Sequence, residues 1–262
     1  MPPPRSGKTV ISLDRACELA RTGDIWVFRG SSGADRAIRG LTNSPVNHVG
    51  MAVVVDDLPP MMWHAELGRS LLDLWTGTHQ RGVQLHDMRD AVLQWGHRYG
   101  QRAWLRQLEG PLGPAEEDGA LRAVARLDGT PFPSTARLTG RWLWGRTPQL
   151  PWPQLPWHSG TADGDAEPVG LETAYCAEVV ALTYEEMDLL PRHRRPNWYD
   201  PGRFWSGDDL ELRAGFRLGG EIEVALPPAP GIVPAPLETA PRPGWRRALD
   251  RITPGALTAG RR

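Results

Sequence analysis

The sequence predicts an α+β fold, because strand-like and helix-like segments both occur along its 262 residues. Two apolar segments of strand length, Val49–Val55 and Met61–Leu67, follow one another across a turn at residues 56–60, which holds two aspartates and two prolines. Two other segments have helical patterns: Ala115–Leu127, with acidic residues in its first turn, and the stretch that begins near Cys176. With 40% hydrophobic residues, the chain has enough apolar surface for a sizeable core.

Further elements follow from the same patterns. A helix is predicted from Leu13 to Ala20, with Ser12 as its N-cap and Cys17 on its apolar stripe, which makes that cysteine a core residue. The nearly continuous apolar run of Val49–Val55 indicates a strand that is buried on both faces. The remaining strands are predicted at Asp24–Phe28, Val83–His86, Arg102–Leu108 and Phe216–Val224, and a short helix at Gly33–Arg39.

One folded domain is predicted, flanked by two unfolded ends. Residues 1–11 are expected to be a disordered N-terminus, and residues 12–226 the folded domain. Residues 227–262 are expected to be a proline-rich disordered tail, because proline removes backbone donors and disfavours helix and sheet alike. A Trp- and Pro-rich insertion at residues 141–170 interrupts the domain. Long loops of this kind are usually functional or disordered, so the insertion is interpreted either as a lid or as a packing strap.

The charge and cysteine content exclude several classes of protein. The formal net charge is -1 and the charged residues are spread along the chain, so no nucleic-acid partner is expected. No apolar run approaches the roughly 18 residues of a membrane span, and no hydrophobic segment typical of a secretory signal follows the first residues. The two cysteines are too few for a disulfide framework or a thiolate zinc site, so a cytoplasmic protein without a metal or other cofactor is expected.

Cys176 is the candidate nucleophile. In the first turn of a helix, a thiol lies beside unpaired backbone N–H groups and the positive end of the helix dipole, and both favour the reactive thiolate. Thr173 is the predicted N-cap, and an apolar stripe then follows at helical spacing: Ala177, Val180, Ala181, Tyr184 and Met187. The alternative is a buried structural cysteine, since free cysteine is among the most buried residue types.

A cysteine nucleophile needs a base and a third group that orients the base. His48 stands where a polar loop enters a buried strand, which suits a base. His64 and Glu66 lie two positions apart on the next strand and therefore on one face, so either could accept from the His48 ring. A zinc site built from His48, His64, Glu66 and Cys176 is a less favoured alternative. The other histidines show no metal-ligand spacing such as H-E-x-x-H: His79, His86, His97, His158 and His193.

Several of these segments resemble one protein family. The stretch Gly23–Gly30, the helix Ala34–Leu41, and Ser44-Pro45 followed by His48-Val49-Gly50 resemble the opening of the circularly permuted NlpC/P60 group, most of all the YiiX/YebB-like permuted papain-like amidases. The later segment Tyr175–Val180 is similar to the Cys-x-Glu-hydrophobic helix start of that family. The order of histidine before cysteine is the permuted order.

The resemblance implies a papain-like core, in which an antiparallel sheet or open barrel packs against the helix that carries the cysteine. It assigns Cys176 as nucleophile and His48 as base. For the third residue it selects His64, while Glu66 is the better carboxylate chemically and is ranked second. The Trp/Pro insertion departs from the family pattern, so the resemblance does not identify the substrate.

The expected activity is that of a cysteine hydrolase or acyltransferase. His48 would take the proton of Cys176, and the sulfur would form an acyl-thioester that water or another acceptor resolves. The oxyanion would lie near the backbone N–H of Cys176, helped by Tyr175. A small peptide, an amide or a lipid acyl group is the expected substrate, and the sequence leaves the oligomeric state open. Two alternatives remain: a papain-like binding or scaffold module without turnover, and a metal-dependent hydrolase.

Overall fold

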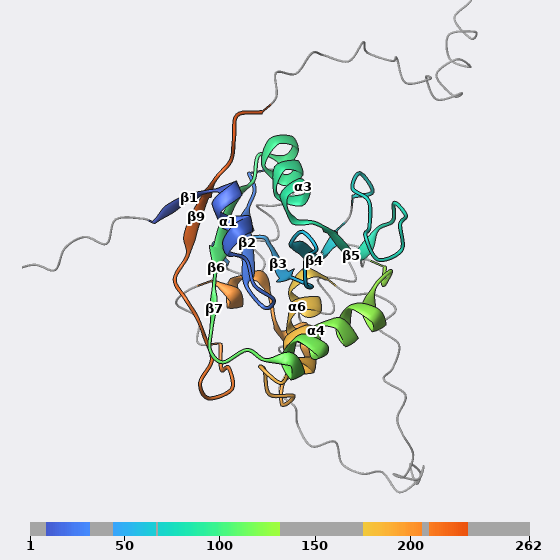
Figure 1. Cartoon of the computed structure of the whole chain (residues 1–262), viewed down its shortest axis with the longest axis vertical. Helices are drawn as coiled ribbons and strands as arrows, with labels where there is room; N and C mark the ends of the chain where they lie inside the picture. The colour runs from blue at the N-terminus through green and yellow to red at the C-terminus, as the bar shows by residue number, and fades with distance from the viewer. Residues whose placement is uncertain (1–8, 32–43, 67, 132–174, 206–209, 230–262) are drawn as a thin grey trace, which may run out of the picture. The chain divides into compact units, whose positions relative to one another are not determined.

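A mostly antiparallel sheet organises the protein, for which a computed structural model describes residues 9–31, 44–66, 68–131, 175–205 and 210–229 (Figure 1). Seven strands form this sheet in the order β1-β9-β6-β2-β3-β4-β5. Their bounds are β1 Val10–Ser12, β2 Ile25–Arg29, β3 His48–Val53, β4 Met61–Glu66, β5 Gly82–Asp87, β6 Arg102–Arg106 and β9 Ile222–Ala225. Neighbouring strands are antiparallel except β1 and β9, which are parallel. A separate two-stranded sheet joins β7 (Leu108–Glu109) to β8 (Arg217–Leu218).

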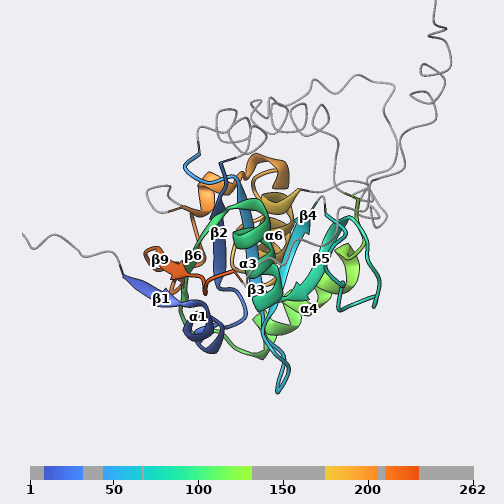
Figure 2. The ribbon, with the colours of Figure 1, turned by 90° about the horizontal axis from the view of Figure 1, so that it is seen from above.

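Helices cover both faces of the large sheet. On one face lie α4 (Pro114–Leu127) and α6 (Cys176–Glu186), with the 3-10 turns η2 (Pro196–Trp198) and η3 (Pro201–Phe204). On the other lie α1 (Leu13–Leu19) and α3 (Met88–Leu93), which continues into the π-helical turn η1 (Gln94–Arg98). Figure 2 shows α3 and α6 flanking strands β3 and β4, and both helices contact β4.

The alternation of side chains along each strand divides the interior into two cores. In β3, Val49, Met51 and Val53 belong to the core under α6, called here the α6 core. Ala52 belongs to the core under α1 and α3, called here the α3 core, which also contains Trp95. Because strand side chains alternate between the faces, neighbouring residues of β3, β4 and β5 contribute to different cores.

Most of the predicted elements are confirmed. The strands predicted around residues 24–28, 49–55, 61–67, 83–86 and 102–108 correspond to β2, β3, β4, β5 and β6, and the helix predicted at Ala115–Leu127 is α4. Ser12 caps α1, and its hydroxyl accepts a hydrogen bond from the Arg15 N–H at 3.2 Å. The helix predicted at 33–39, the insertion at 141–170 and nearly all of the tail lie outside the described residues.

Three expectations are wrong in detail. Val10 and Ile11 were expected in a disordered N-terminus, but they form β1, since pairing with β9 supplies their backbone partners. The strand predicted at Phe216–Val224 is divided into β8 and β9 on either side of Gly219-Gly220. Of the two alternatives for the sheet, the antiparallel sheet is supported and the open barrel is not, since β1 and β5 lie at its two edges. The N-cap of α6 is Tyr175 and not Thr173, because the chain is still extended at Tyr175 (φ -127°, ψ 164°).

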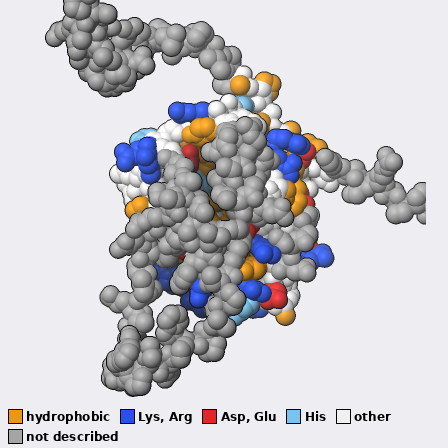
Figure 3. All heavy atoms as spheres, turned by 180° about the vertical axis from the view of Figure 1, so that it is seen from behind, with side chains coloured by type: hydrophobic (Ala, Val, Ile, Leu, Met, Phe, Trp, Pro, Cys, Tyr) orange, Lys and Arg blue, Asp and Glu red, His pale blue; other side chains and the backbone are white. Residues whose placement is uncertain are grey.

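The composition of the surface agrees with a net charge near zero. On the face shown in Figure 3, the Arg and Lys side chains of the described residues lie in several separate places, among hydrophobic and acidic side chains. Within the described parts of the chain, no helix has both the length and the apolar character that crossing a membrane requires.

Candidate active site

Three histidines and a glutamine form a hydrogen-bonded row across three adjacent strands. His48 begins β3, His64 lies in β4, and His86 lies with Gln84 in β5. The distance from Nε2 of His48 to Nδ1 of His64 is 3.3 Å, and from Nε2 of His64 to Nδ1 of His86 it is 2.9 Å. Nε2 of His86 then lies 3.0 Å from Oε1 of Gln84. We call these four residues the histidine row.

The glutamine fixes the direction of every hydrogen bond in the row. Nε2 of Gln84 donates to the carbonyl of Gly82 at 3.4 Å, so Oε1 is the atom that faces His86 and accepts from its Nε2–H. A neutral imidazole carries one N–H, so Nδ1 of His86 must accept from Nε2–H of His64. By the same argument, Nδ1 of His64 accepts from Nε2–H of His48. In the resulting order, Nδ1 of His48 carries no proton and can act as an acceptor.

Burial keeps His64 and His86 neutral. His64, Gln84 and His86 are each at most 1% exposed. Burial lowers the pKa of His64 well below its ordinary value, and neighbouring His86 and His48 lower it further. Burial also lowers the pKa of His86 to about 4. At neutral pH both rings therefore carry a single proton, as the hydrogen-bond order requires.

Trp95 closes the row on the α3 side. Its ring lies edge-on to both His48 and His64, at centroid distances of 4.7 and 4.4 Å. Phe28 packs against Trp95 at 4.6 Å and against His48 at 5.7 Å. Trp95 belongs to the π-helical turn η1, and π-helical turns occur frequently at functional sites. The indole thus covers one side of both imidazoles, of which His64 is fully buried.

Glu66 lies on the far side of His64 from His48. Its Oε2 is 4.0 Å from Nε2 of His64 and 3.9 Å from Nδ1 of His86. Burial raises the pKa of the carboxyl, opposed by a hydrogen bond from Trp95. Of the two residues considered as the orienting group, His64 is therefore the one that contacts His48. Glu66 instead faces Nε2 of His64, the ring nitrogen that points away from His48.

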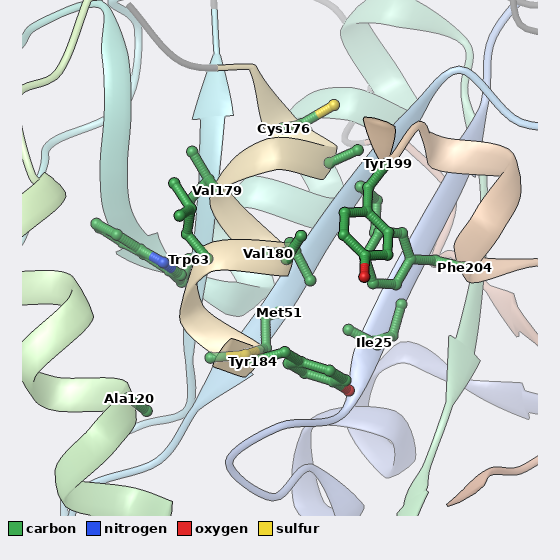
Figure 4. Close-up of a cluster of buried hydrophobic side chains, with 14 of the residues drawn as sticks. Ile25, Met51, Trp63, Ala120, Cys176, Val179, Val180, Tyr184, Tyr199 and Phe204 are labelled. Carbon is green, nitrogen blue, oxygen red and sulfur yellow. The ribbon is translucent and has the colours of Figure 1, made fainter. Parts of the chain in front are cut away.

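Cys176 is the first residue of α6 and is buried in the α6 core. Figure 4 shows it at one end of that cluster, with its sulfur directed away from Tyr184. Burial raises the pKa of the thiol to about 11, opposed by hydrogen bonds from the backbone N–H groups of Val49, Ala177 and Cys176 itself. The prediction of a thiolate at the helix start is therefore wrong. The N–H groups act in the expected direction, but desolvation of the sulfur outweighs them.

Val49 connects the cysteine to the histidine row. Its side chain belongs to the α6 core with Cys176, whereas the rings of His48 and His64 contact Trp95 of the α3 core. The two groups therefore lie in different layers, and the link between them is the Val49 N–H, which follows His48 directly and hydrogen bonds to the Cys176 sulfur. The row brings His48 and His64 into contact, with Glu66 beside His64.

The predicted oxyanion residue Tyr175 has another role. Its hydroxyl has two carbonyl oxygens within hydrogen-bond distance, that of Asn197 at 3.0 Å and that of Tyr199, and its single proton is shared between them. This hydroxyl is committed to anchoring the start of α6 and cannot at the same time donate to an oxyanion. The backbone N–H of Cys176 stays a prediction for that role.

The less favoured zinc set is replaced by a different group. Among the described residues, the ligand atoms of His64, Glu66 and His86 lie within 4.8 Å of one another, and neither Cys176 nor His48 belongs to this group. Sequence reasoning missed His86, Gln84 and Trp95. The alternation Val83-Gln84-Leu85-His86 was the available signal, since it places the two polar residues on the same face of β5.

Comparisons with solved structures find a structural likeness. No family model matches the chain, and no curated protein matches it. The chain is similar to the crystal structure of YiiX from Escherichia coli O157:H7, described as a metalloprotein and as DUF1105. The two are 19% identical with a TM-score of 0.41, over 64% of this chain and 66% of that one. The matched region is slightly less than two thirds of that protein, and the likeness assigns neither a family nor an activity.

Proposed function

We propose that the protein is a cysteine hydrolase or acyltransferase of the permuted papain-like type, with Cys176 as nucleophile, His48 as base and His64 as the residue that orients the base. The observation that carries this proposal is the direction of the hydrogen bonds in the histidine row. That order holds Nδ1 of His48 as a proton acceptor. A base needs this tautomer of His48, and Gln84 selects it through the hydrogen bonds of His86 and His64.

A backbone hydrogen bond beside His48 supports the pairing of this base with Cys176. Because the N–H of Val49 hydrogen bonds to Sγ of Cys176, the Cα of the preceding His48 lies within about 6 Å of that sulfur, from standard backbone and hydrogen-bond lengths. Nδ1 is the ring nitrogen nearer to the backbone. Because the His48 ring lies against Trp95, in the other layer from Cys176, its approach to the thiol when substrate binds is part of the proposal. Catalytic hydrogen bonds often tighten only when substrate binds.

The raised pKa of Cys176 determines the order of events. The thiol is protonated at neutral pH, so proton transfer to Nδ1 of His48 accompanies attack of the sulfur on a carbonyl carbon. The new S–C bond forms as the carbonyl π bond gives its electron pair to oxygen. Collapse of this adduct expels the leaving amine or alkoxide, which takes the proton from His48. Water or a second acceptor then resolves the thioester by the same base.

The substrate proposal follows from the residues and the resemblance together. A small peptide, an amide or a lipid acyl group is the substrate that we propose, in a cytoplasmic setting. The papain-like assignment is supported by the mostly antiparallel sheet, the cysteine at the start of a helix packed on it, and the order of His48 before Cys176.

Detection of an acyl-enzyme tests the proposal. The protein is mixed with p-nitrophenyl acetate and p-nitrophenyl octanoate, and intact mass is followed after rapid quenching. We expect one acyl group on Cys176, none in Cys176→Ala, and an unchanged adduct in Cys17→Ala, the matched control. If the wild type forms the adduct no faster than Cys176→Ala, the result would instead favour the scaffold module, in which Cys176 is not expected to be acylated.

A further inference from the structure

The group formed by His64, Glu66 and His86 has the geometry of a metal site. Its three atoms, Nε2 of His64, Oε2 of Glu66 and Nδ1 of His86, are separated by 2.9, 3.9 and 4.0 Å. A point equidistant from three atoms with these separations lies about 2.1 Å from each, which matches Zn–N and Zn–O distances in proteins. The three side chains therefore need little movement to hold one ion.

The chemistry of the three donors is equally specific. Two imidazoles and one carboxylate form a ligand set that zinc and related first-row divalent ions accept. Oε1 of Glu66 is also buried, with no hydrogen-bond partner within the described residues. A buried carboxylate oxygen without a partner is costly, and an ion bound beside it would remove that cost.

We propose that a divalent transition metal ion, zinc by the chemistry of the donors, binds at His64, Glu66 and His86 and switches off the base His48. The binding stands independently, whereas the switch rests on the function proposed above. The site regulates rather than catalyses, because its ligands are at most 8% exposed and a substrate cannot reach them.

The switch follows from the hydrogen-bond order of the row. A metal on Nε2 of His64 displaces the proton that this atom donates to His86, so the neutral His64 must carry its proton on Nδ1. Nδ1–H of His64 then donates to Nε2 of His48. Nε2 of His48 must therefore lose its proton, and His48 carries its single proton on Nδ1 instead. No net proton is gained or lost by the row. His48 now presents an N–H to the thiol and can no longer accept its proton.

Metal binding is measured with Co²⁺ on the full-length, chelator-treated protein, followed by displacement with Zn²⁺. We expect one Co²⁺ per chain with visible d–d absorption and no sulfur-to-cobalt charge-transfer band. Glu66→Gln and His86→Gln should each weaken binding by more than about 100-fold, since even residues outside the ligand set commonly cost 10- to 100-fold. The controls are His48→Ala, which removes the ring beside His64, and Cys176→Ala, which lies in the α6 core; neither residue supplies a ligand, so both variants should bind normally.

The outcomes separate this proposal from the proposed function. The metal site is overturned if the protein binds no Co²⁺. It is also overturned if binding survives both ligand substitutions in variants whose circular dichroism matches the wild type. Either result leaves the cysteine chemistry standing. Zinc should lower the acylation rate of Cys176 at the concentration where it displaces Co²⁺. In Glu66→Gln, the ratio of rates with and without zinc should be one. An acylation rate that rises with bound zinc overturns the switch.

Discussion

The two faces of the sheet are built from the same strands and differ in what they bury. Under α6, the strands contribute apolar residues such as Met51 and Trp63 to a continuous core, with Cys176 at its end. Under α3, the same strands contribute His64 and His86 between apolar neighbours. Burying polar groups costs free energy unless they are hydrogen bonded. The difference indicates that the α6 face stabilises the fold, whereas the α3 face holds an arrangement that stability alone does not require.

The first prediction concerns His48, at the partly exposed end of the histidine row on the α3 face. His48→Ala should lower the rate of Cys176 acylation by about 10²- to 10⁴-fold, the usual contribution of a general base, which corresponds to about 3–5 kcal/mol of activation free energy. The free energy of unfolding should fall by about 1–3 kcal/mol, since Nδ1 of the buried His64 loses its donor. Stopped-flow acylation and urea titration measure the two quantities. An unchanged acylation rate would remove His48 from the mechanism.

The second prediction breaks the α6 face. Met51→Ala removes a fully buried side chain and should lower the free energy of unfolding by about 2–5 kcal/mol. Acylation by the folded fraction should keep its rate, because Met51 lies beside Tyr184, away from the Cys176 end of the cluster (Figure 4), and the histidine row lies on the other side of the strand. Urea titration gives the stability, and a loss below 1 kcal/mol would show that the α6 core is less tightly packed than it is in the structure.

The third prediction removes the anchor of the row. Gln84→Leu leaves the Nε2–H of His86 without its acceptor, which should cost about 1–3 kcal/mol of stability. It should also lower the acylation rate, because His48 then loses its preferred tautomer. Gln84→Glu supplies an acceptor oxygen again and should restore much of the rate, which a role in packing alone would not explain. Equal rates in the leucine and glutamate variants would contradict the role in setting the tautomers.

The smallest effect is on the pH dependence of stability. The pKa of His86 is lowered to about 4 in the folded protein, against about 6.5 in an unfolded chain. Between pH 4 and 6.5 the unfolded state therefore binds more protons than the folded state. The contribution of His86 to the free energy of unfolding is complete above pH 6.5 and is lost as the pH falls towards 4. Raised carboxyl pKa values at Asp24 and Glu185 act in the opposite direction. The comparison of wild type with His86→Gln isolates the histidine, and the variant should show the flatter acid limb in thermal denaturation.

The same contrast between the faces explains what the sequence could predict. The apolar runs and the cap at Ser12 gave the elements of the fold, because hydrophobic periodicity is a local property. His48 and His64 were found from their places on adjacent strands. The partnership of His64 with His86 was not found, because it depends on the register between β4 and β5, in which His64 stands opposite Gln84.

The environment of Cys176 could not be predicted for a related reason. Its position at a helix start is visible in the sequence, and the N–H groups there do lower its pKa. The larger effect of burial depends on the packing of α6 against β3, which joins segments more than a hundred residues apart. A helix-start position alone therefore does not make a thiol acidic.

The most direct test of the account is the relative rate at which iodoacetamide alkylates the two cysteines near neutral pH. Burial raises the pKa of both thiols to about 11, and Cys17 is the more exposed, lining a surface cavity of about 390 Å³. Exposure and acidity alone would therefore make Cys17 at least as reactive. If His48 acts as base, Cys176 should react faster than Cys17, and His48→Ala should abolish that advantage while the rate at Cys17 stays the same. Equal rates at both residues, or a Cys176 rate that His48→Ala does not change, would contradict the proposed chemistry.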